Sequence, residues 1–258
     1  MAPVPNDYVE FAQRLADASG AVIRRYFRTP VQVDDKADQT PVTIADREAE
    51  TVMRRMIAER FPAHGIIGEE EAPVRPDAEW VWTLDPVDGT KAFISGKPLF
   101  GTLIGLCHRG TPRLGIVDQP VLKERWVGVA GRPSTLNGTR IAVRACPELK
   151  LALLNATSPD MFAGDDAARF DRLRRAVKLA MYGGDCYAYA LLAAGFIDLV
   201  VEAGLKIYDY CPLVPVIEGA GGVITDWNGK PLGLSSGGHA IAAGDKAAHA
   251  AALKMLAA

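Results

Sequence analysis

Apolar residues recur at helical spacing in two stretches near the start of the chain. In residues 6–28 they fall on one face of a helix, and in residues 43–61 they do so again. The polar segment 34–39, which contains Lys36, separates the two stretches. This pattern predicts two amphipathic helices joined by a polar connection.

Short apolar runs bounded by turn residues follow the second helix, and such runs are typical of strands. The first two end in carboxylates and three longer ones come next; together they cover residues 65–68, 80–84, 99–108, 113–119 and 124–130. Asn137-Gly138 favours a tight hairpin that would put residues 141–143 on a paired strand. We therefore predict an antiparallel meander with the two helices covering one face.

The pattern changes near Cys146-Pro147, after which strands and helices alternate. We expect strands over 151–155, 197–202, 222–225 and 241–243, and helices over 167–181, 186–194, 212–219 and 246–256. Alternation of this kind predicts a second, more parallel α/β unit. A boundary near residue 145 divides the chain into an N-terminal unit, 1–145, and a C-terminal unit, 146–258.

The composition is that of a folded globular protein with a small-molecule partner. Of the 258 residues 49% are hydrophobic, and 29 basic and 31 acidic residues give a net charge of -2. Because this charge is small and mixed along the chain, it provides no electrostatic footprint for nucleic acid or an anionic membrane. We expect neither as a partner.

The sequence also lacks the signals of secreted, membrane and zinc proteins. The four cysteines lie far apart without a C-x-x-C pair, and the four histidines have no zinc-ligand spacing. The first residues have neither the basic region nor the apolar core of a signal peptide. The most apolar segment, 189–201, is too short to cross a bilayer. We expect a cytoplasmic protein with reduced cysteines.

Candidate chemistry centres on the segment 85–90, Asp-Pro-Val-Asp-Gly-Thr, which follows an apolar run. Its two carboxylates, three residues apart, could hold a hard cation through oxygen atoms. From Gly89 onward the residues predict a helix start whose free N–H groups would bind phosphate. The alternative is an ordinary Asp-x-x-Asp-Gly turn. A calcium loop is excluded because Pro86, Thr90 and Gly96 interrupt its pattern.

Two further carboxylates have both a local and a functional interpretation. Glu69 belongs either to a solvated acidic turn or, if its strand neighbours the one ending at Asp85, to a metal site. Asp209 lies just ahead of a predicted helix. It either favours the dipole of that helix or is the carboxylate that the second unit contributes to a cleft.

Asp46 is a third such residue. It follows Thr43 by three positions, which predicts a capping box at the start of the second helix. The first turn of that helix could also aim Asp46 into the active pocket, together with Lys36 from the preceding loop. The two interpretations are compatible, because a cap fixes the side-chain rotamer that a supporting base needs.

These segments resemble the signatures of the inositol monophosphatase family of magnesium-dependent, lithium-sensitive phosphatases. The resemblance covers nearly the whole chain, with the motifs in the same order and spacing. They are Gly68-Glu69-Glu70, the segment 85–90, Tyr208-Asp209 and Glu218-Gly219-Ala220-Gly221-Gly222. The resemblance implies an αβαβα sandwich of the sugar-phosphatase type, in agreement with the two units, and a homodimer.

The resemblance also assigns roles to single residues. It implies two or three Mg2+ ions per site, with the ligands Glu69, Asp85, Asp88, Asp209 and the carbonyl of Val87. Thr90, supported by Asp46, would orient the attacking water, and the amides of Gly89 and Thr90 would hold the phosphate. The catalytic residues are then Thr90, Asp46 and Glu69, and the expected substrate contacts are Gly89, Thr90, Asp185, Glu202 and Asp209.

Two segments narrow the expected substrate. Residues 208–213 and 183–189 depart from the inositol-cleaving pattern and look like the histidinol-phosphate phosphatases of this family, which act in histidine biosynthesis. Histidinol phosphate contains an ammonium and an imidazole, so its pocket should offer extra carboxylates. Asp185 and Glu202 are the candidates, although Asp185 could instead be a helix N-cap after Gly183-Gly184.

The resulting hypothesis is a Mg2+-dependent hydrolysis of a phosphate monoester, in which positioning and charge neutralisation do most of the catalysis. Rival substrates are inositol 1-phosphate and a 3'-phosphonucleotide; an acidic pocket argues against the nucleotide. A rival of another class is a catalytically silent, metal-binding regulatory protein. The complete set of ligands and the Thr90 hydroxyl argue against a silent protein.

Overall fold

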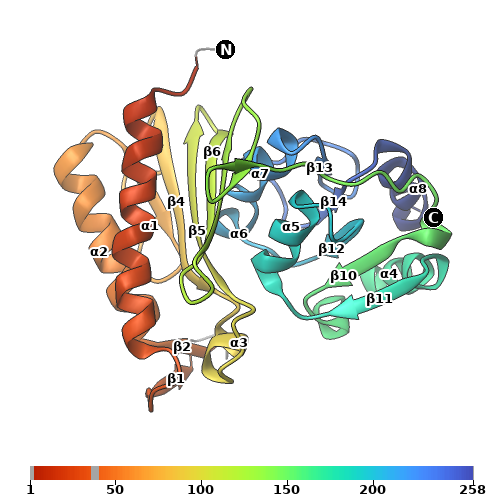
Figure 1. Ribbon diagram of the computed structural model, residues 1–258, viewed down its shortest axis with the longest axis horizontal. Coiled ribbons are helices and arrows are strands. Elements are labelled where there is room, and N and C mark those ends of the chain that lie inside the picture. The colour runs from red at the N-terminus through yellow and green to blue at the C-terminus, as the bar shows by residue number, and fades with distance from the viewer. Residues whose placement is uncertain (1–2, 36–40, 258) are drawn as a thin grey trace.

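The computed structural model describes residues 3–35 and 41–257 (Figure 1). Two long helices open the chain, as predicted: α1 (Asn6–Tyr26) and α2 (Ile44–Arg60). Between them lies a short antiparallel pair, β1 (Val33–Asp35) with β2 (Pro41–Thr43), where only a polar connection was expected. Lys36 lies outside the described residues.

The first sheet is the predicted meander, with the strand order β3-β4-β5-β6-β7-β8-β9. Its strands are β3 (Gly65–Gly68), β4 (Trp80–Asp88), β5 (Gly101–His108), β6 (Thr111–Gln119), β7 (Glu124–Val129), β8 (Thr135–Leu136) and β9 (Thr139–Arg140). Only β3 and β4 pair in parallel; the other neighbours are antiparallel.

The strand predicted over residues 141–143 is wrong. The hairpin forms at Asn137-Gly138, but its second strand is β9 and the chain then leaves the sheet. The Val143 amide donates to the Ala220 carbonyl in the C-terminal half, 3.0 Å away. The segment is therefore a connection between the halves, which its apolar residues alone could not distinguish from a strand.

The second sheet has the strand order β11-β10-β12-β14-β13. Its strands are β10 (Leu153–Ala156), β11 (Leu179–Tyr182), β12 (Leu199–Glu202), β13 (Val223–Thr225) and β14 (Ala240–Ala243). β10 pairs in parallel with β11 and β12, whereas β14 pairs antiparallel with β12 and β13. The sheet is therefore mixed and only partly parallel.

The remaining helices correct two predictions. They are α3 (Thr90–Ile94), α4 (Asp165–Ala176), α5 (Asp185–Ala193), α6 (Ile207–Tyr210), α7 (Leu213–Gly219) and α8 (Lys246–Ala257), with 3-10 turns at Leu149–Leu151 and Pro159–Met161. The helix expected over 167–181 ends at Ala176, because the following residues pair with β10 as strand β11. Asp209 lies within the short helix α6, which was not expected.

The layers stack as helix, sheet, helix, sheet, helix (Figure 1). α1 and α2 contact β4, β5 and β6, while α5 and α7 lie between the sheets and α4 and α8 cover the far side. This is the predicted αβαβα sandwich. A Cβ at Gly115 in β6 would lie 1.8 Å from the Pro212 carbonyl oxygen, so glycine is required there for the C-terminal half to dock. The division near residue 145 stays a prediction.

Candidate active site

Two parallel strand ends bring Glu69 and Asp85 to the same edge of the first sheet. Gly68 is in register with Leu84, and the Glu69 amide donates to the Leu84 carbonyl at 3.1 Å. The predicted neighbourhood of the two strands is confirmed. Asp85 is only 2% exposed, and Glu69 is half-buried beside it.

The segment after Asp85 turns sharply into the pocket. The pairing of β4 with β5 shifts register between Asp85 and Asp88, and the Asp85 carboxylate accepts a hydrogen bond from the Val87 amide at 3.0 Å. Gly89 has φ 96°, in the left-handed region, and α3 begins directly after it. A Cβ at Gly89 would lie 3.1 Å from Oδ2 of Asp185, so a side chain would be crowded there.

The C-terminal half supplies the opposite wall through the starts of α5 and α6. Asp185 is the first residue of α5 and has φ 45°, a strained conformation that aspartate tolerates better than most residues. The next amide, of Cys186, donates to Oδ2 of Asp88 at 2.5 Å. In α6, Asp209 accepts from the Lys206 amide at 2.7 Å. The cap of α5 is Gly184, so the N-cap interpretation of Asp185 is wrong.

A cavity of about 500 Å3 lies where these elements meet. Its lining unites most of the predicted residues with some that were not predicted: Pro41, Glu69, Asp85, Val87, Asp88, Gly89, Thr90, Lys91, Thr157, Asp185, Gly204, Lys206, Tyr208 and Asp209. A more enclosed cavity of about 100 Å3 shares Asp88, Asp185 and Asp209 with it and reaches Glu202. Asp46 lines neither cavity.

Burial, and after it the repulsion between neighbouring carboxylates, sets the electrostatics of the larger cavity. Burial, followed by the charges of Glu69, Asp88 and Asp209, raises the pKa of Asp85 well above its usual range. Burial and the neighbouring carboxylates likewise raise the pKa of Asp88. Burial raises the pKa of Asp209 to about 7. Such a group of carboxylates is stable as anions only when a cation joins it.

The two carboxylates expected to contact the leaving group both line the smaller, more enclosed cavity. Burial raises the pKa of Glu202 to about 7, and its carboxylate accepts from the Thr157 amide at 2.9 Å. Burial raises the pKa of Asp185 to about 6, although a hydrogen bond with Thr157 and the charge of Lys91 oppose the shift. Both groups can therefore change protonation when a charged ligand arrives.

The capping box at the start of α2 is confirmed. Thr43 Oγ1 accepts from the Ala45 amide at 3.1 Å, and Asp46 Oδ2 accepts from the Thr43 amide at 2.9 Å. The other oxygen, Oδ1 of Asp46, is buried and has no hydrogen-bond partner among the described residues. The Thr90 hydroxyl donates to the Val87 carbonyl at 3.2 Å. The joint role of Asp46 and Thr90 stays a prediction.

Sequence reasoning missed four polar side chains of the cavity wall, namely Lys91, Thr157, Lys206 and Tyr208. Three of them lie within three residues of Thr90 or Asp209, so their place in the chain was an available signal. Thr157 had no such signal, because it follows β10 and reaches the cavity only through the packing of the second sheet.

The donor chemistry of the cavity fits Mg2+, which prefers carboxylate and carbonyl oxygens. Glu69, Asp85, Asp88 and Asp209 provide carboxylates and Val87 a carbonyl around one space. Among the described residues, however, no group of three or more histidine, cysteine, aspartate or glutamate side chains is arranged as a ready metal site. Asp88 and Asp209 each accept a backbone amide at Oδ2, and a carboxylate has a second oxygen with which it can bind an ion.

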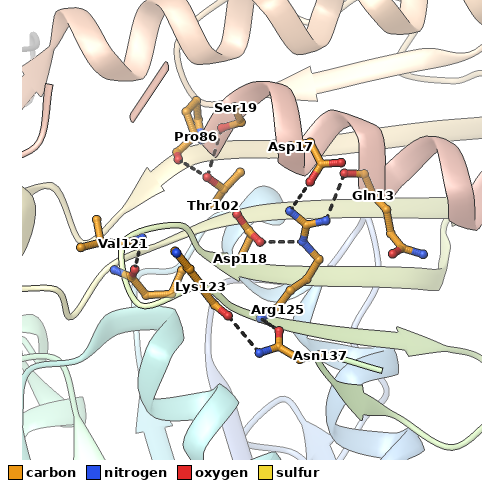
Figure 2. Close-up of polar contacts among 11 residues, drawn as sticks. Gln13, Asp17, Ser19, Pro86, Thr102, Asp118, Val121, Lys123, Arg125 and Asn137 are labelled. Carbon is orange, nitrogen blue, oxygen red and sulfur yellow. Dashed lines mark hydrogen bonds and ion pairs between the residues drawn. The ribbon is translucent and has the colours of Figure 1, made fainter. Parts of the chain in front are cut away.

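A second cavity, of about 490 Å3, lies on the other face of the first sheet, between α1 and β7. One of its arginines, Arg125, is neutralised within the fold: it pairs with Asp118 at 2.6 Å and Asp17 at 2.8 Å. Figure 2 shows this network, in which Arg125 also donates to the Gln13 carbonyl. This cavity has no comparable group of facing carboxylates.

The layered sandwich and its acidic cavity are the features expected of the family that the sequence resembles. The chain belongs to the inositol monophosphatase family, whose sequence model matches residues 5–257. It is 52% identical over 251 residues to the bifunctional phosphatase IMPL2, chloroplastic, of Arabidopsis thaliana, covering 94% of this chain and 72% of the relative. It is 34% identical over 226 residues to the histidinol-phosphatase of Chlorobaculum parvum, covering 86% of each.

A solved structure of similar sequence also belongs with the inositol monophosphatases. An inositol monophosphatase from Zymomonas mobilis matches with a TM-score of 0.91 and 48% sequence identity, over 98% of each chain. The protein is therefore a phosphatase of this family. All four cysteines are free thiols. Within the described part of the chain, no helix is both long and apolar enough to span a membrane.

Proposed function

We propose that the protein hydrolyses histidinol phosphate to histidinol and phosphate with the help of Mg2+. The observation that supports this proposal is the set of facing carboxylates around the cavity, with raised pKa values at Asp85, Asp88 and Asp209. A cluster of this kind costs stability unless it binds a cation. Mg2+ is the ion used in this family.

Glu69, Asp85, Asp88, Asp209 and the Val87 carbonyl would hold the metal. When bound, Mg2+ supplies activation of a water and neutralises charge on the phosphate and the leaving oxygen. The chain's own contribution is positioning, because phosphoryl transfer makes little covalent demand on the protein. No residue becomes phosphorylated in this scheme.

Thr90 and its surroundings would orient the water and the phosphate. The Thr90 hydroxyl faces the Val87 carbonyl, and Gly89 and Thr90 both line the cavity, so their amides can approach a phosphate oxygen. Asp46, whose buried Oδ1 has no hydrogen-bond partner in the described part of the chain, would support Thr90. Lys91 and Lys206 add positive charge at the wall, which favours a dianionic ester.

Asp185 and Glu202 support histidinol phosphate over other esters. They lie beside the metal-facing carboxylates and line the inner cavity, where a cationic leaving group would pair with them. Inositol 1-phosphate is the second candidate, because similar chains include an inositol monophosphatase. An inositol ring has no positive charge, so it would leave both carboxylates without an ionic partner.

The deciding experiment measures phosphate release from L-histidinol phosphate and from inositol 1-phosphate side by side, with Mg2+ and with EDTA. We expect a much larger kcat/KM for histidinol phosphate and no turnover with EDTA. If inositol 1-phosphate is preferred, the proposed catalytic site stands but histidinol phosphate is not the substrate. Turnover that persists in EDTA would contradict the proposed dependence on Mg2+. The homodimer and the cytoplasmic location stay predictions.

A further inference from the structure

The turn that follows β3 is held by a buried carboxylate from another element. Glu50, in α2, is 0% exposed, and its two oxygens accept from the Glu70 amide at 2.9 Å and from the Glu71 amide at 3.0 Å. These amides belong to the two residues directly after Glu69. A buried carboxylate that accepts two backbone amides fixes the path of the chain at that point.

Arg54, one helical turn further along α2, makes further hydrogen bonds to the same turn. Its Nε donates to Glu50 at 2.7 Å, while its other nitrogens donate to the Glu71 carbonyl at 2.7 Å and the Ala72 carbonyl at 3.1 Å. Both the amides and the carbonyls of the turn are therefore engaged. Arg54 also neutralises Glu50 beside an acidic run that would otherwise repel it.

The fit between the pair and the strand is close. A Cβ at Gly68 would lie 2.3 Å from Oε1 of Glu50 and 2.7 Å from Nη2 of Arg54, so no larger residue fits there. Asp46, Glu50 and Arg54 follow one another at intervals of four residues, which puts them on one face of α2. That face therefore extends from the capping box at the start of α2 to the back of the turn carrying Glu69.

We infer that Glu50 and Arg54 are positioning residues for Glu69. Neither of them lines the cavity. By fixing the backbone on the C-terminal side of Glu69, while the Glu69 amide is fixed to Leu84, they hold its carboxylate toward Asp85. This inference rests on the proposed metal site, and it predicts that the pair sets the affinity for the ion.

The Asp118–Arg125 pair is a matched control (Figure 2). Asp118 is also a buried carboxylate of the N-terminal half, 4% exposed and paired with an arginine at 2.6 Å. It faces α1 rather than the catalytic cavity. A substitution there should disturb folding in the same way as one at Glu50, without reaching Glu69.

The test uses Mn2+ in place of Mg2+ and measures its binding from the EPR signal of the free ion, without substrate. Glu50→Gln should weaken Mn2+ binding by about 10- to 100-fold, the range for residues that orient a metal ligand. Asp118→Asn should change it less than about twofold. If Glu50→Gln does not fold, Arg54→Lys, which retains the charge but loses the planar fork, is measured against the same control.

The outcomes separate this inference from the proposed function. Wild-type affinity in the folded Glu50→Gln or Arg54→Lys protein would overturn the inference, as would an equal loss in Asp118→Asn. Asp85→Asn serves as the check on the metal site itself. If wild type and Asp85→Asn bind Mn2+ equally, the metal site of the proposed function is wrong.

Discussion

Two cavities have nearly the same volume, about 500 and 490 Å3, but opposite electrostatic character. Between α1 and β7, Asp118 is paired with Arg125 and both charges are neutralised within the fold. At the junction of the two halves, the charges acting on Asp85 are the carboxylates Glu69, Asp88 and Asp209. Volume therefore does not distinguish the proposed catalytic cavity from the other one.

The two cavities differ in whether a buried carboxylate has a cationic side chain of the same protein as its partner. Asp118, and likewise Asp198 with Arg144 at 2.6 Å, is matched by an arginine from the same chain. Such a pair is complete without a ligand. In the acidic cavity, by contrast, burial and the charges of other carboxylates raise the pKa values of Asp85 and Asp88, and the proposed function assigns a cation to this group.

Asp85→Asn should give the largest contrast. Turnover should fall by about 10^3-fold or more, since metal stabilisation of the reaction is worth several kcal/mol. The metal-free protein should be at least as stable as wild type, because one repelling charge is removed. Phosphate release and thermal unfolding with EDTA measure both effects. Near-normal turnover would contradict the metal model.

Asp118→Asn should give the reverse result. Removing one partner of a buried pair leaves Arg125 without its strongest contact, which should cost about 3 kcal/mol in the free energy of unfolding. The kcat should stay within about twofold of wild type, because Asp118 lies on the other face of the sheet. Urea unfolding and steady-state kinetics test this. A large loss of kcat would mean that the two cavities are coupled.

The pH dependence of stability should report the burial of Glu202. Glu202 has a pKa raised from 4.5 to about 7, so the folded state binds its proton more tightly than the unfolded chain does. The stabilisation of the folded state by this proton is therefore fully present below pH 4.5. It is lost as pH rises to about 7, which lowers the free energy of unfolding by about 3 kcal/mol. Urea unfolding of metal-free protein across this range measures the slope.

Glu202→Gln is the control for that slope. The amide retains an acceptor for the Thr157 N–H but cannot titrate, so the loss of stability between pH 4.5 and 7 should become smaller. An unchanged slope in this variant would assign the effect to other carboxylates.

Asp185→Asn should have the smallest effect and the most selective one. Asparagine tolerates the positive φ of this position, so the start of α5 should be preserved. The loss of one charge should raise KM for histidinol phosphate about tenfold, the value of one good charged contact. The KM for inositol 1-phosphate should change much less. Equal changes for both substrates would remove the specificity role of Asp185.

Local patterns predicted much of this molecule. The two N-terminal helices, the meander and the capping box of Thr43 with Asp46 depend on residues close in the chain, so periodicity and cap chemistry were sufficient. Short apolar segments were harder, because a four-residue strand and the end of a helix have similar patterns. This is why β11 was assigned to the helix before it.

The carboxylates of the site were predicted individually, through their motifs, but not their partners. Glu50 and Arg54, four residues apart on a helix, have the spacing of an ordinary surface ion pair. They become buried, and form hydrogen bonds with the turn after Glu69, only when α2 packs beside β3 and β4. Thr157 joined the cavity in the same way, through contacts distant in sequence.

The sequence by itself determined the classes of element, the acidic motifs and the family to which they belong, because these depend on short-range periodicity and on residue chemistry. Only the tertiary structure decided which carboxylates were neutralised and which were left facing one another. Whether a buried charge finds a partner depends on side chains brought together from distant segments, as Asp118 meets Arg125 while Asp85 meets Glu69.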